Sequence, residues 1–564
     1  MSSLFRKKSI DKILKDAEEG VDLHHKSGLN KVLNVRDLTY MGIAAVVGAG
    51  IFSTIGTAAS NGGPGISLLF VITAVTCGFA ALCYAEFASR VPIAGSAYTY
   101  AYVSFGELIA WIIGWALILE YAIGNIVVAI SWSSYFNNLL EAVGIHLPGW
   151  LIVDPTTAEK AYTATISQST TGNTMTPDMQ NIINAWETAP VIFGKKMFIN
   201  LPAFVIVCLV SVLTYVGIRE SKRSANAMVI FKIAVIIFVI VLGFFYTKPS
   251  YWSPFMPNGF EGVLKGVSAV FYAYIGFDAI STTAEECRNP QRDLPKGMIY
   301  SLLICTVLYI LIALVLTGMV PFTELNVNDP LAFVFERVGQ DWISYIVAIS
   351  AVVATTSVLL VFQLGQPRIW MSMSRDGLLP KAFGKVHKKY QTPYFSTIVT
   401  GILVAVPALF MQSSLMTDLT SIGTLFAFVL VSAGVLLLPR LEKDNDRRSF
   451  KLPYINGKLI VPALYLIFAF FSRGRIQEAL QNLGTDSLQE ILFLLYVLLG
   501  LILSILTFIR NYSFIPMMGV LFCAYLLIEI PAVSWLWFFG WMALGLLIYF
   551  LYGYRKSKLN QPAV

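Results

Sequence analysis

Runs of about twenty apolar residues recur along the chain, separated by shorter polar segments. A helix rises 1.5 Å per residue, so about 20 apolar residues are needed to cross the hydrocarbon core of a bilayer. Ten such spans precede a charged segment at 440–451, and four follow it. The pattern therefore predicts an all-α polytopic membrane protein with about 14 transmembrane helices. The predicted spans are 38–60, 66–89, 108–137, 197–218, 225–246, 263–284, 297–320, 342–372, 394–411, 417–438, 459–472, 490–509, 514–530 and 533–552.

Positive charge is concentrated in alternate segments between these spans. With the N-terminus on the inner side, 31 of the 40 Lys and Arg residues lie in inner segments, eight lie in outer segments, and Lys232 lies within a span. Cytoplasmic loops of membrane proteins carry such an excess. We therefore expect a multi-pass protein of the cell (cytoplasmic) membrane with both termini cytoplasmic. The long segment 146–196 is predicted to be an external loop.

The composition excludes a soluble fold and several other classes. Hydrophobic residues make up 56% of the chain and charged residues 13%, whereas soluble domains carry about 25% charged residues. The formal charge of +7 does not indicate nucleic-acid binding, because Lys and Arg are scattered between apolar runs and form no basic face with interleaved aromatics. The six cysteines occur singly, so disulfide and zinc frameworks are disfavoured, and no metal or cofactor is predicted.

Glycine clusters interrupt two spans, the first at 41–52 (MGIAAVVGAGIF) and the sixth at 271–278 (FYAYIGFD). These spans correspond to each other if the first ten form a five-plus-five pair, and such interruptions in corresponding spans point to a transporter site. Alternatively, the glycines only let neighbouring helices approach closely. The predicted organisation is a cytoplasmic segment 1–36, a first inverted repeat 37–246, a second inverted repeat 262–440, additional spans in 458–553 and a cytoplasmic tail 554–564.

A broken helix can bind a zwitterion without any charged side chain. Its second half presents free N–H groups and the positive end of its dipole, while its first half presents free carbonyl groups. An amino acid therefore fits between two such breaks. The sequence predicts that the carboxylate binds N–H groups at the break formed by Gly48, Ala49, Gly50 and Ile51, and that the ammonium binds carbonyl groups near Val46, Tyr272, Ala273 and Ile275.

Three charged residues lie well inside predicted spans: Glu120, Lys232 and Asp278. A charge at mid-bilayer costs on the order of 2.5–3.5 kcal/mol, so such residues usually face a cavity or a partner. Glu120 either packs between helices or lines the pocket and favours basic substrates. Lys232 is a candidate proton-coupling residue, with a structural salt bridge as the alternative. Asp278 is a candidate gating or structural residue near the inner half of its span.

Several spaced motifs resemble a known family. The runs 47–52 (VGAGIF), 84–88 (YAEFA), 94–100 (AGSAYTY) and 119–121 (LEY) are similar to those of the amino acid-polyamine-organocation superfamily. The runs 271–278, 285–290 (EECRNP), 293–295 (DLP) and 374–380 (SRDGLLP) narrow the resemblance to the cationic amino acid transporter branch. The resemblance covers nearly the whole chain.

The resemblance implies a leucine-transporter-like core of ten spans with four extra spans, and roles for particular residues. It implies that Ala49, Gly50 and Ile51 hold the substrate carboxylate and that Tyr272 is an aromatic gate over the substrate. It also implies that Lys232 takes the place of the sodium ion of sodium-coupled relatives. The residues that match the stretch of span eight facing the ion site and the pocket are Thr355, Thr356 and Ser357.

These patterns together predict a secondary active amino acid transporter, and proton symport by alternating access is favoured over exchange. A channel would need repeated polar filter residues, and a polytopic membrane enzyme would need a catalytic histidine or metal cluster at a membrane face. The sequence displays neither pattern, so the protein is not expected to be an enzyme. The expected partners are an amino acid, a proton and the lipid bilayer, without nucleic acid. The sequence indicates no protein partner and does not choose between cationic and neutral substrates.

Overall fold

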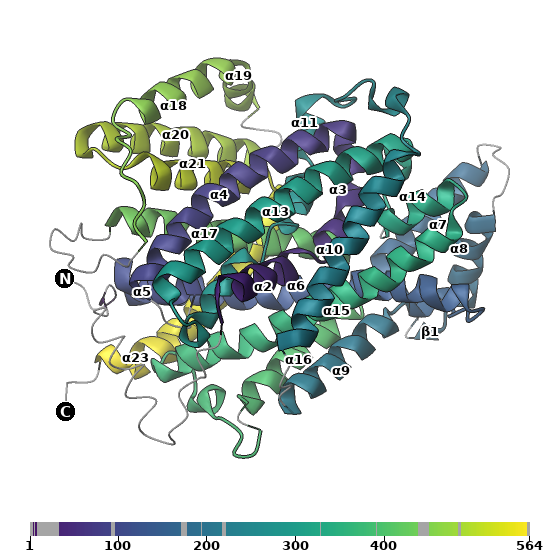
Figure 1. The fold of residues 1–564 in the computed structure, drawn as a ribbon, viewed down its shortest axis with the longest axis horizontal. Coiled ribbons are helices and arrows are strands. Elements are labelled where there is room, and N and C mark those ends of the chain that lie inside the picture. Colours follow the sequence, from purple (N-terminus) through teal and green to yellow (C-terminus); the bar gives the residue numbers. More distant parts are fainter. Residues whose placement is uncertain are drawn as a thin grey trace.

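The computed structural model is a bundle of long helices (Figure 1). It describes residues 4, 6–7, 33–91, 96–170, 177–192, 194–216, 222–327, 329–390, 392–437, 450–482 and 487–560. Most of the predicted N-terminal segment 1–36 lies outside these residues. Eight helical stretches of the described chain are long and apolar enough to cross a membrane by length and composition, and shorter apolar helices accompany them. The prediction of a helical, polytopic membrane protein is therefore confirmed.

Each predicted span coincides with one helix or with a pair of half-helices. The first ten are α2 (Val35–Val46) with α3 (Ile55–Gly62), α4 (Ile66–Arg90), α6 (Glu107–Ala142), α9 (Leu201–Val216), α10 (Lys222–Phe244), α12 (Val267–Tyr272) with the 3-10 helix Phe277–Glu286, α13 (Pro290–Met319), α15 (Asp341–Arg375), α16 (Tyr394–Ala408) and α17 (Ser413–Leu437). The short helix α11 (Gly259–Leu264) precedes α12. The last four are α18 (Ile460–Phe471), α20 (Ser487–Arg510), α21 (Phe514–Ile528) and α22 (Ala532–Ile548).

The connections hold further short elements that the apolar pattern did not predict. They are α5 (Ser96–Ser104), α7 (Pro155–Thr170), α8 (Pro177–Thr188), β1 (Val191–Ile192), β2 (Lys195–Lys196), α14 (Pro330–Arg337), α19 (Arg473–Gln481) and α23 (Tyr554–Lys556). Turns of 3-10 helix lie at Gly63–Gly65, Gly149–Leu151, Pro249–Trp252, Phe277–Glu286, Phe322–Glu324, Lys381–Gly384 and Lys558–Asn560, and π-helical turns lie at Gly50–Thr54 and Tyr549–Gly553.

Helix α6 forms the centre of the bundle. Almost all of its apolar stretch is buried, and it packs against α15, α17 and α9, while α13 packs against α4 and α2. The C-terminal helix α22 packs on α6 through stacked indoles, Trp115 on Trp541 with centroids 4.7 Å apart. The indole N–H of each donates to the backbone carbonyl of the other. The extra C-terminal helices therefore contact the bundle directly.

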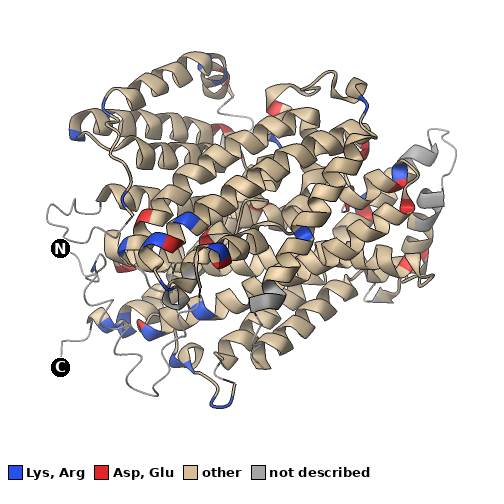
Figure 2. Cartoon of the chain, in the orientation of Figure 1, with Lys and Arg blue, Asp and Glu red and all other residues tan. Residues whose placement is uncertain are grey.

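The described part of segment 146–196 forms α7, α8 and the antiparallel pair β1 and β2, and α7 packs against α8. Trp186 stacks between Tyr162 and Phe198, at centroid distances of 4.7 and 5.3 Å, and the Lys196 ammonium donates to the Trp186 carbonyl. These elements lie at one end of the bundle, and α5 and α23 lie at the opposite end (Figure 1). Lys and Arg are concentrated toward the end with α23 (Figure 2), in keeping with the sidedness expected from loop charge.

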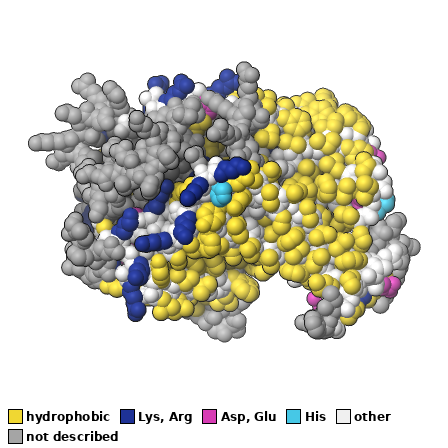
Figure 3. Space-filling view, turned by 90° about the horizontal axis from the view of Figure 1, so that it is seen from below, with side chains coloured by type: hydrophobic (Ala, Val, Ile, Leu, Met, Phe, Trp, Pro, Cys, Tyr) yellow, Lys and Arg dark blue, Asp and Glu magenta, His cyan; other side chains and the backbone are white. Residues whose placement is uncertain are grey.

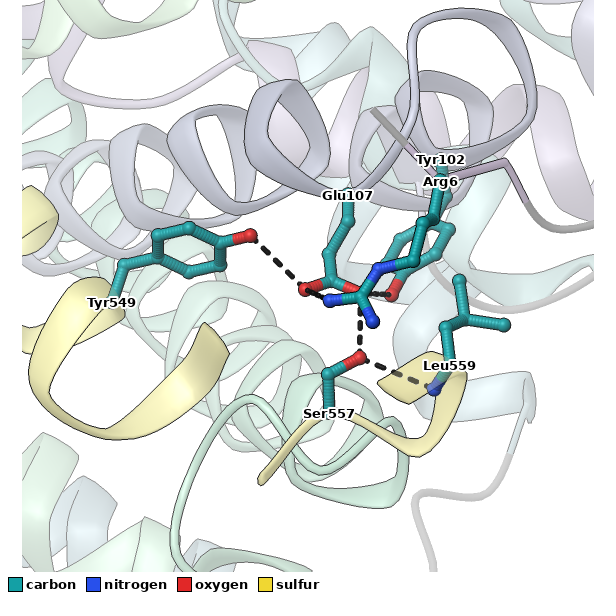
Figure 4. A network of polar contacts seen from close by, with 6 residues as sticks. All are labelled: Arg6, Tyr102, Glu107, Tyr549, Ser557 and Leu559. Atoms are coloured by element: carbon teal, nitrogen blue, oxygen red, sulfur yellow. Dashed lines mark hydrogen bonds and ion pairs between the residues drawn. The ribbon is translucent and has the colours of Figure 1, made fainter. Parts of the chain in front are cut away.

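A polar network at that end joins three distant parts of the chain (Figure 4). Glu107, fully buried at the start of α6, accepts hydrogen bonds from the hydroxyls of Tyr102, Tyr549 and Ser557. The Arg6 guanidinium also lies 3.2 Å from this carboxylate. A negative charge is favourable at the N-terminus of a helix. The network therefore fastens both terminal segments to the start of α6.

We expect Glu107→Gln to lower the free energy of unfolding by roughly 1–3 kcal/mol, because hydrogen bonds to a charged group are lost or weakened in a buried setting. Thermal unfolding of the purified protein in detergent measures the effect. Glu261→Gln is the matched control, since Glu261 is exposed in α11. An unchanged melting temperature in Glu107→Gln would show that the network does not stabilise the fold.

Candidate functional site

The first span is broken between α2 and α3. Helix α2 ends at Val46, Val47 adopts an extended conformation with φ −77° and ψ 93°, and a π-helical turn follows from Gly50. The N–H groups of Ile51 and Phe52 both donate to the Gly48 carbonyl at 3.2 Å. Within the described chain, the N–H groups of Gly48, Ala49 and Gly50 have no hydrogen-bond acceptor. The break thus exposes three consecutive donors. Ile51, also predicted as a donor, has an acceptor inside the turn.

The sixth span is broken after α12. Tyr272 ends the α-helix, Gly276 adopts a left-handed conformation with φ 116°, and a 3-10 helix continues from Phe277. The Tyr272 carbonyl accepts the Ile275 N–H at 3.2 Å. The carbonyl groups of Ala273, Tyr274 and Ile275 have no donor among the residues that the structure describes. This break therefore exposes consecutive acceptors.

The two breaks lie against each other. A Cβ atom added to Gly50 would lie 2.3 Å from the Cα atom of Ala273. One added to Gly276 would lie 3.0 Å from the backbone of Ala45. The contact at Gly50 is too short for any side chain, and at Gly276 the left-handed φ of 116° favours glycine and the contact is tight. The free donors of one break and the free acceptors of the other are therefore held close together in a buried region.

Side-chain hydroxyls satisfy several carbonyl groups around the first break. Tyr309 in α13 donates to the Val46 carbonyl at 3.0 Å, and Tyr135 in α6 donates to that of Phe52. Thr54 lies 3.0 Å from the Gly50 carbonyl and 3.1 Å from that of Ala269. The sequence interpretation missed these three residues. A phenol or hydroxyl within an apolar span was the signal that could have indicated them.

Lys232 in α10 is fully buried next to the first break. Its ammonium nitrogen lies 3.3 Å from the Ala44 carbonyl oxygen and 3.4 Å from that of Val47. These carbonyls lie at the C-terminal end of α2, where the helix dipole favours a positive charge. A single lysine therefore contacts the half-helix whose end forms the break.

Glu120 and Asp278 are buried close to each other between α6 and the sixth span. The Glu120 carboxyl lies beside the Thr424 hydroxyl of α17. The Asp278 carboxyl lies in the first turn of the 3-10 helix, near the backbone N–H groups of Gly276 and Ala279. One oxygen of each carboxyl has no hydrogen-bond partner in the described structure.

Tyr272 and the three candidates from span eight occupy different surroundings. The Tyr272 hydroxyl donates to the Gly124 carbonyl of α6 at 3.0 Å, one turn beyond Glu120. The Thr356 hydroxyl accepts the Trp132 indole N–H at 2.9 Å. Val358 of α15 lies against the first break. A Cβ atom added to Gly48 would lie 2.7 Å from the Val358 side chain. Thr355 and Ser357 are buried and donate to carbonyls of their own helix, those of Ala351 and Ala354.

Comparison with known proteins identifies the family of this chain. Residues 33–488 match the family model described as amino acid permease, and residues 511–557 match the one described as the C-terminus of AA_permease. The chain belongs to the amino acid permease family. The predicted membership of the amino acid-polyamine-organocation superfamily is confirmed, and the protein is a transporter of amino acids and not an enzyme.

Three relatives illustrate the range of this family. The chain is 38% identical over 560 residues to the branched-chain amino acid permease BcaP of Bacillus subtilis (strain 168), covering 99% of each chain. It is 36% identical over 562 residues to a methylthioribose transporter of the same organism, covering 100% of each. It is 34% identical over 458 residues to the vacuolar cationic amino acid transporter 4 of Arabidopsis thaliana, covering 79% of this chain and 68% of that one.

Proposed function

We propose that this permease moves an amino acid together with a proton by alternating access, with the substrate bound between the broken spans one and six. The supporting observation is the pairing of free backbone donors at Gly48, Ala49 and Gly50 with free acceptors at Ala273 and Ile275. Backbone groups left unpaired in a buried region are costly unless a ligand satisfies them. An α-carboxylate and an α-ammonium supply the matching charges.

The binding mode follows from the two helix ends. The carboxylate accepts hydrogen bonds from the N–H groups before the second half of span one, where the dipole is positive. The ammonium donates to the carbonyls of Ala273 and Ile275. Val46 and Tyr272 contribute less, because their carbonyls already accept the Tyr309 hydroxyl and the Ile275 N–H. Tyr272 acts as the aromatic gate and Asp278 holds the inner half of span six.

Coupling to protons is assigned to Lys232. Burial disfavours a charged lysine, whereas the carbonyls of Ala44 and Val47 favour it. The balance between these effects changes if α2 moves relative to α10. A protonated Lys232 would stabilise the arrangement that binds substrate, and loss of its proton to the cytoplasm would release it. Amino acid exchange without proton movement is the alternative.

The proposed topology is the five-plus-five inverted repeat, with repeats at 37–246 and 262–440 and extra spans in 458–553. The supporting observations are fourteen helices or half-helix pairs at the predicted places and breaks in the corresponding first and sixth spans. Both termini are proposed to face the cytoplasm, with 146–196 outside. The cell membrane is the proposed location.

Reconstituted uptake tests the proposed function. Radiolabelled amino acids of every class, with methylthioribose added because one relative bears that name, are offered to proteoliposomes with and without an inward proton gradient. Concentrative amino acid uptake that requires the gradient supports symport. Uptake that needs internal amino acid and ignores the gradient supports exchange. Uptake of methylthioribose alone would contradict the proposed substrate class.

Glu120 is proposed to set selectivity for the side chain of the substrate. If its carboxyl lines the pocket, Glu120→Gln should lower kcat/KM for Lys and Arg about tenfold or more, which corresponds to about 1.4 kcal/mol, and that for Ala and Leu by much less. Competition uptake assays measure the ratio. Glu261→Gln, at an exposed position, should leave it unchanged. Equal losses for both substrate groups in Glu120→Gln would show a packing role.

A further inference from the structure

An apolar groove runs along the outside of the bundle between α9 and α16. Its cavity volume is about 370 Å³, and almost all of its lining is apolar. Small residues form its floor, and exposed branched side chains form its walls. The two helices touch at the floor, because a Cβ on Gly401 would lie 2.7 Å from the Ser211 hydroxyl oxygen. The floor includes Cys208, Ser211, Gly401 and Ala405, and the walls include Val212 and Ile402.

The groove is suited to a hydrocarbon chain and not to a polar solute. The Ser211 hydroxyl donates to the Val207 carbonyl at 2.7 Å and accepts the Gln363 amide at 2.8 Å, so its hydrogen bonds are made within the protein. The lining runs from Phe204 to Tyr215 along α9. At 1.5 Å per residue this is about 17 Å, close to half the thickness of a bilayer core of about 30 Å. The groove therefore matches one leaflet.

A basic segment lies at the Tyr215 end of the groove. The Tyr215 ring packs against His387 and Tyr390, at centroid distances of 5.9 and 6.0 Å. Lys388 and Lys389 are exposed, and the Lys389 ammonium lies 5.4 Å from the centre of the Tyr390 ring. The whole stretch 377–417 contains four lysines and no acidic residue. The end of the apolar groove therefore meets a cluster of lysines.

Basic and apolar side chains adjoin each other on one face of the molecule. Figure 3 shows a row of Lys and Arg side chains, with a histidine beside it, at the border of a broad hydrophobic field. Acyl chains and anionic headgroups meet in this way at the edge of a membrane, and basic residues near that surface attract anionic lipids. We favour a lipid over a protein partner because the lining is almost wholly apolar and its length along α9 matches one leaflet of a bilayer.

We propose that this groove and the basic segment form a binding site for one anionic phospholipid. An acyl chain lies between α9 and α16, and the phosphate contacts Lys388 and Lys389 near His387. The site is separate from the breaks in spans one and six, and it faces the lipid and not the interior of the bundle. Its occupant would join α9 to α16 at the leaflet that carries the basic segment.

Native mass spectrometry of the full chain with added lipid tests the site. The wild-type protein is mixed with phosphatidylglycerol or phosphatidylcholine of identical acyl chains. We expect the first bound phosphatidylglycerol to bind about tenfold more tightly than phosphatidylcholine, since two lysines contribute. Lys388→Gln with Lys389→Gln should remove this preference. Lys556→Gln with Lys558→Gln removes the same charge from exposed positions on the C-terminal segment and should retain the preference.

A second pair of variants tests the acyl chain. Val212→Trp fills the groove from an exposed wall, 62% accessible, so the fold should tolerate it. Val205→Trp places the same side chain on α9 outside the groove lining. Phosphatidylglycerol affinity should fall in Val212→Trp alone, and glycerol phosphate should not compete. Equal affinities for the two lipids in wild type, an unchanged preference without the two lysines, or equal binding by the two tryptophan variants would each overturn the proposal.

Discussion

Gly50→Leu is expected to abolish substrate binding in a thermal-shift titration with the best transported amino acid. Any Cβ at this position would lie 2.3 Å from the Cα atom and 2.7 Å from the Cβ atom of Ala273. Neither atom is the flexible end of a side chain, so spans one and six would have to separate. That movement takes the free N–H groups away from the free carbonyls. Both halves of the proposed site would then be lost together.

The control for this substitution is Gly78→Leu. A Cβ at Gly78 in α4 meets no atom within 4 Å, so the same change should retain the full substrate-dependent shift. Gly50→Ala, which keeps the clash but adds less volume, is expected to bind weakly. Size-exclusion chromatography of each variant shows that it is folded. A normal shift in monodisperse Gly50→Leu would contradict binding at the crossing of the two breaks.

The apolar pattern was enough to locate the long helices. Spans of about twenty apolar residues have few alternatives in a bilayer, where backbone groups must be satisfied within the segment, and every predicted span coincides with a helix or half-helix pair. Helix α5 was not predicted, because its nine residues carry three tyrosines among small and polar residues and are too short to span. Helices α7 and α8 of the external segment were also not predicted, because they are polar.

The site was predictable only as far as backbone chemistry determines it. Glycine clusters and a deeply placed lysine are visible in one sequence, and the structure brings Gly50, Ala273 and Lys232 into one region. The face of a helix that points inward is harder to assign. Thr355, Thr356 and Ser357 are consecutive, so each points about 100° from the next, and only the fold shows Val358 against Gly48.

The Glu107 network shows a further limit of sequence reasoning. Its members come from residues 6, 102, 107, 549 and 557, and no spacing rule relates them. Burial in this region also raises the pKa of Tyr98, with the Asp376 carboxylate, which accepts its hydrogen bond, as a second cause. The phenol thus stays a hydrogen-bond donor at neutral pH. Such contacts depend on how the chain ends return to the bundle.

Lys232→Met is expected to eliminate concentrative uptake driven by an acid-outside gradient. Methionine keeps a long, unbranched side chain in the buried site but removes the ammonium that contacts the carbonyls of Ala44 and Val47 at 3.3 and 3.4 Å. Without a group that gains and loses a proton there, movement of α2 would no longer be linked to the gradient. Reconstituted vesicles with a radiolabelled substrate measure the accumulation ratio, which should fall to about one.

Lys265→Met separates this effect from a general loss of charge. Lys265 is exposed just after α11, so its replacement should leave the accumulation ratio at the wild-type value. Substrate-dependent thermal shifts show whether Lys232→Met still binds substrate. Binding should persist, because the proposed carboxylate site consists of the backbone N–H groups of Gly48 to Gly50 and does not use the Lys232 side chain. Binding without accumulation would assign Lys232 to coupling. Acid-stimulated accumulation that persists in Lys232→Met would refute that role and move it to Glu120 or Asp278, the buried carboxyls whose second oxygens have no hydrogen-bond partner in the described structure.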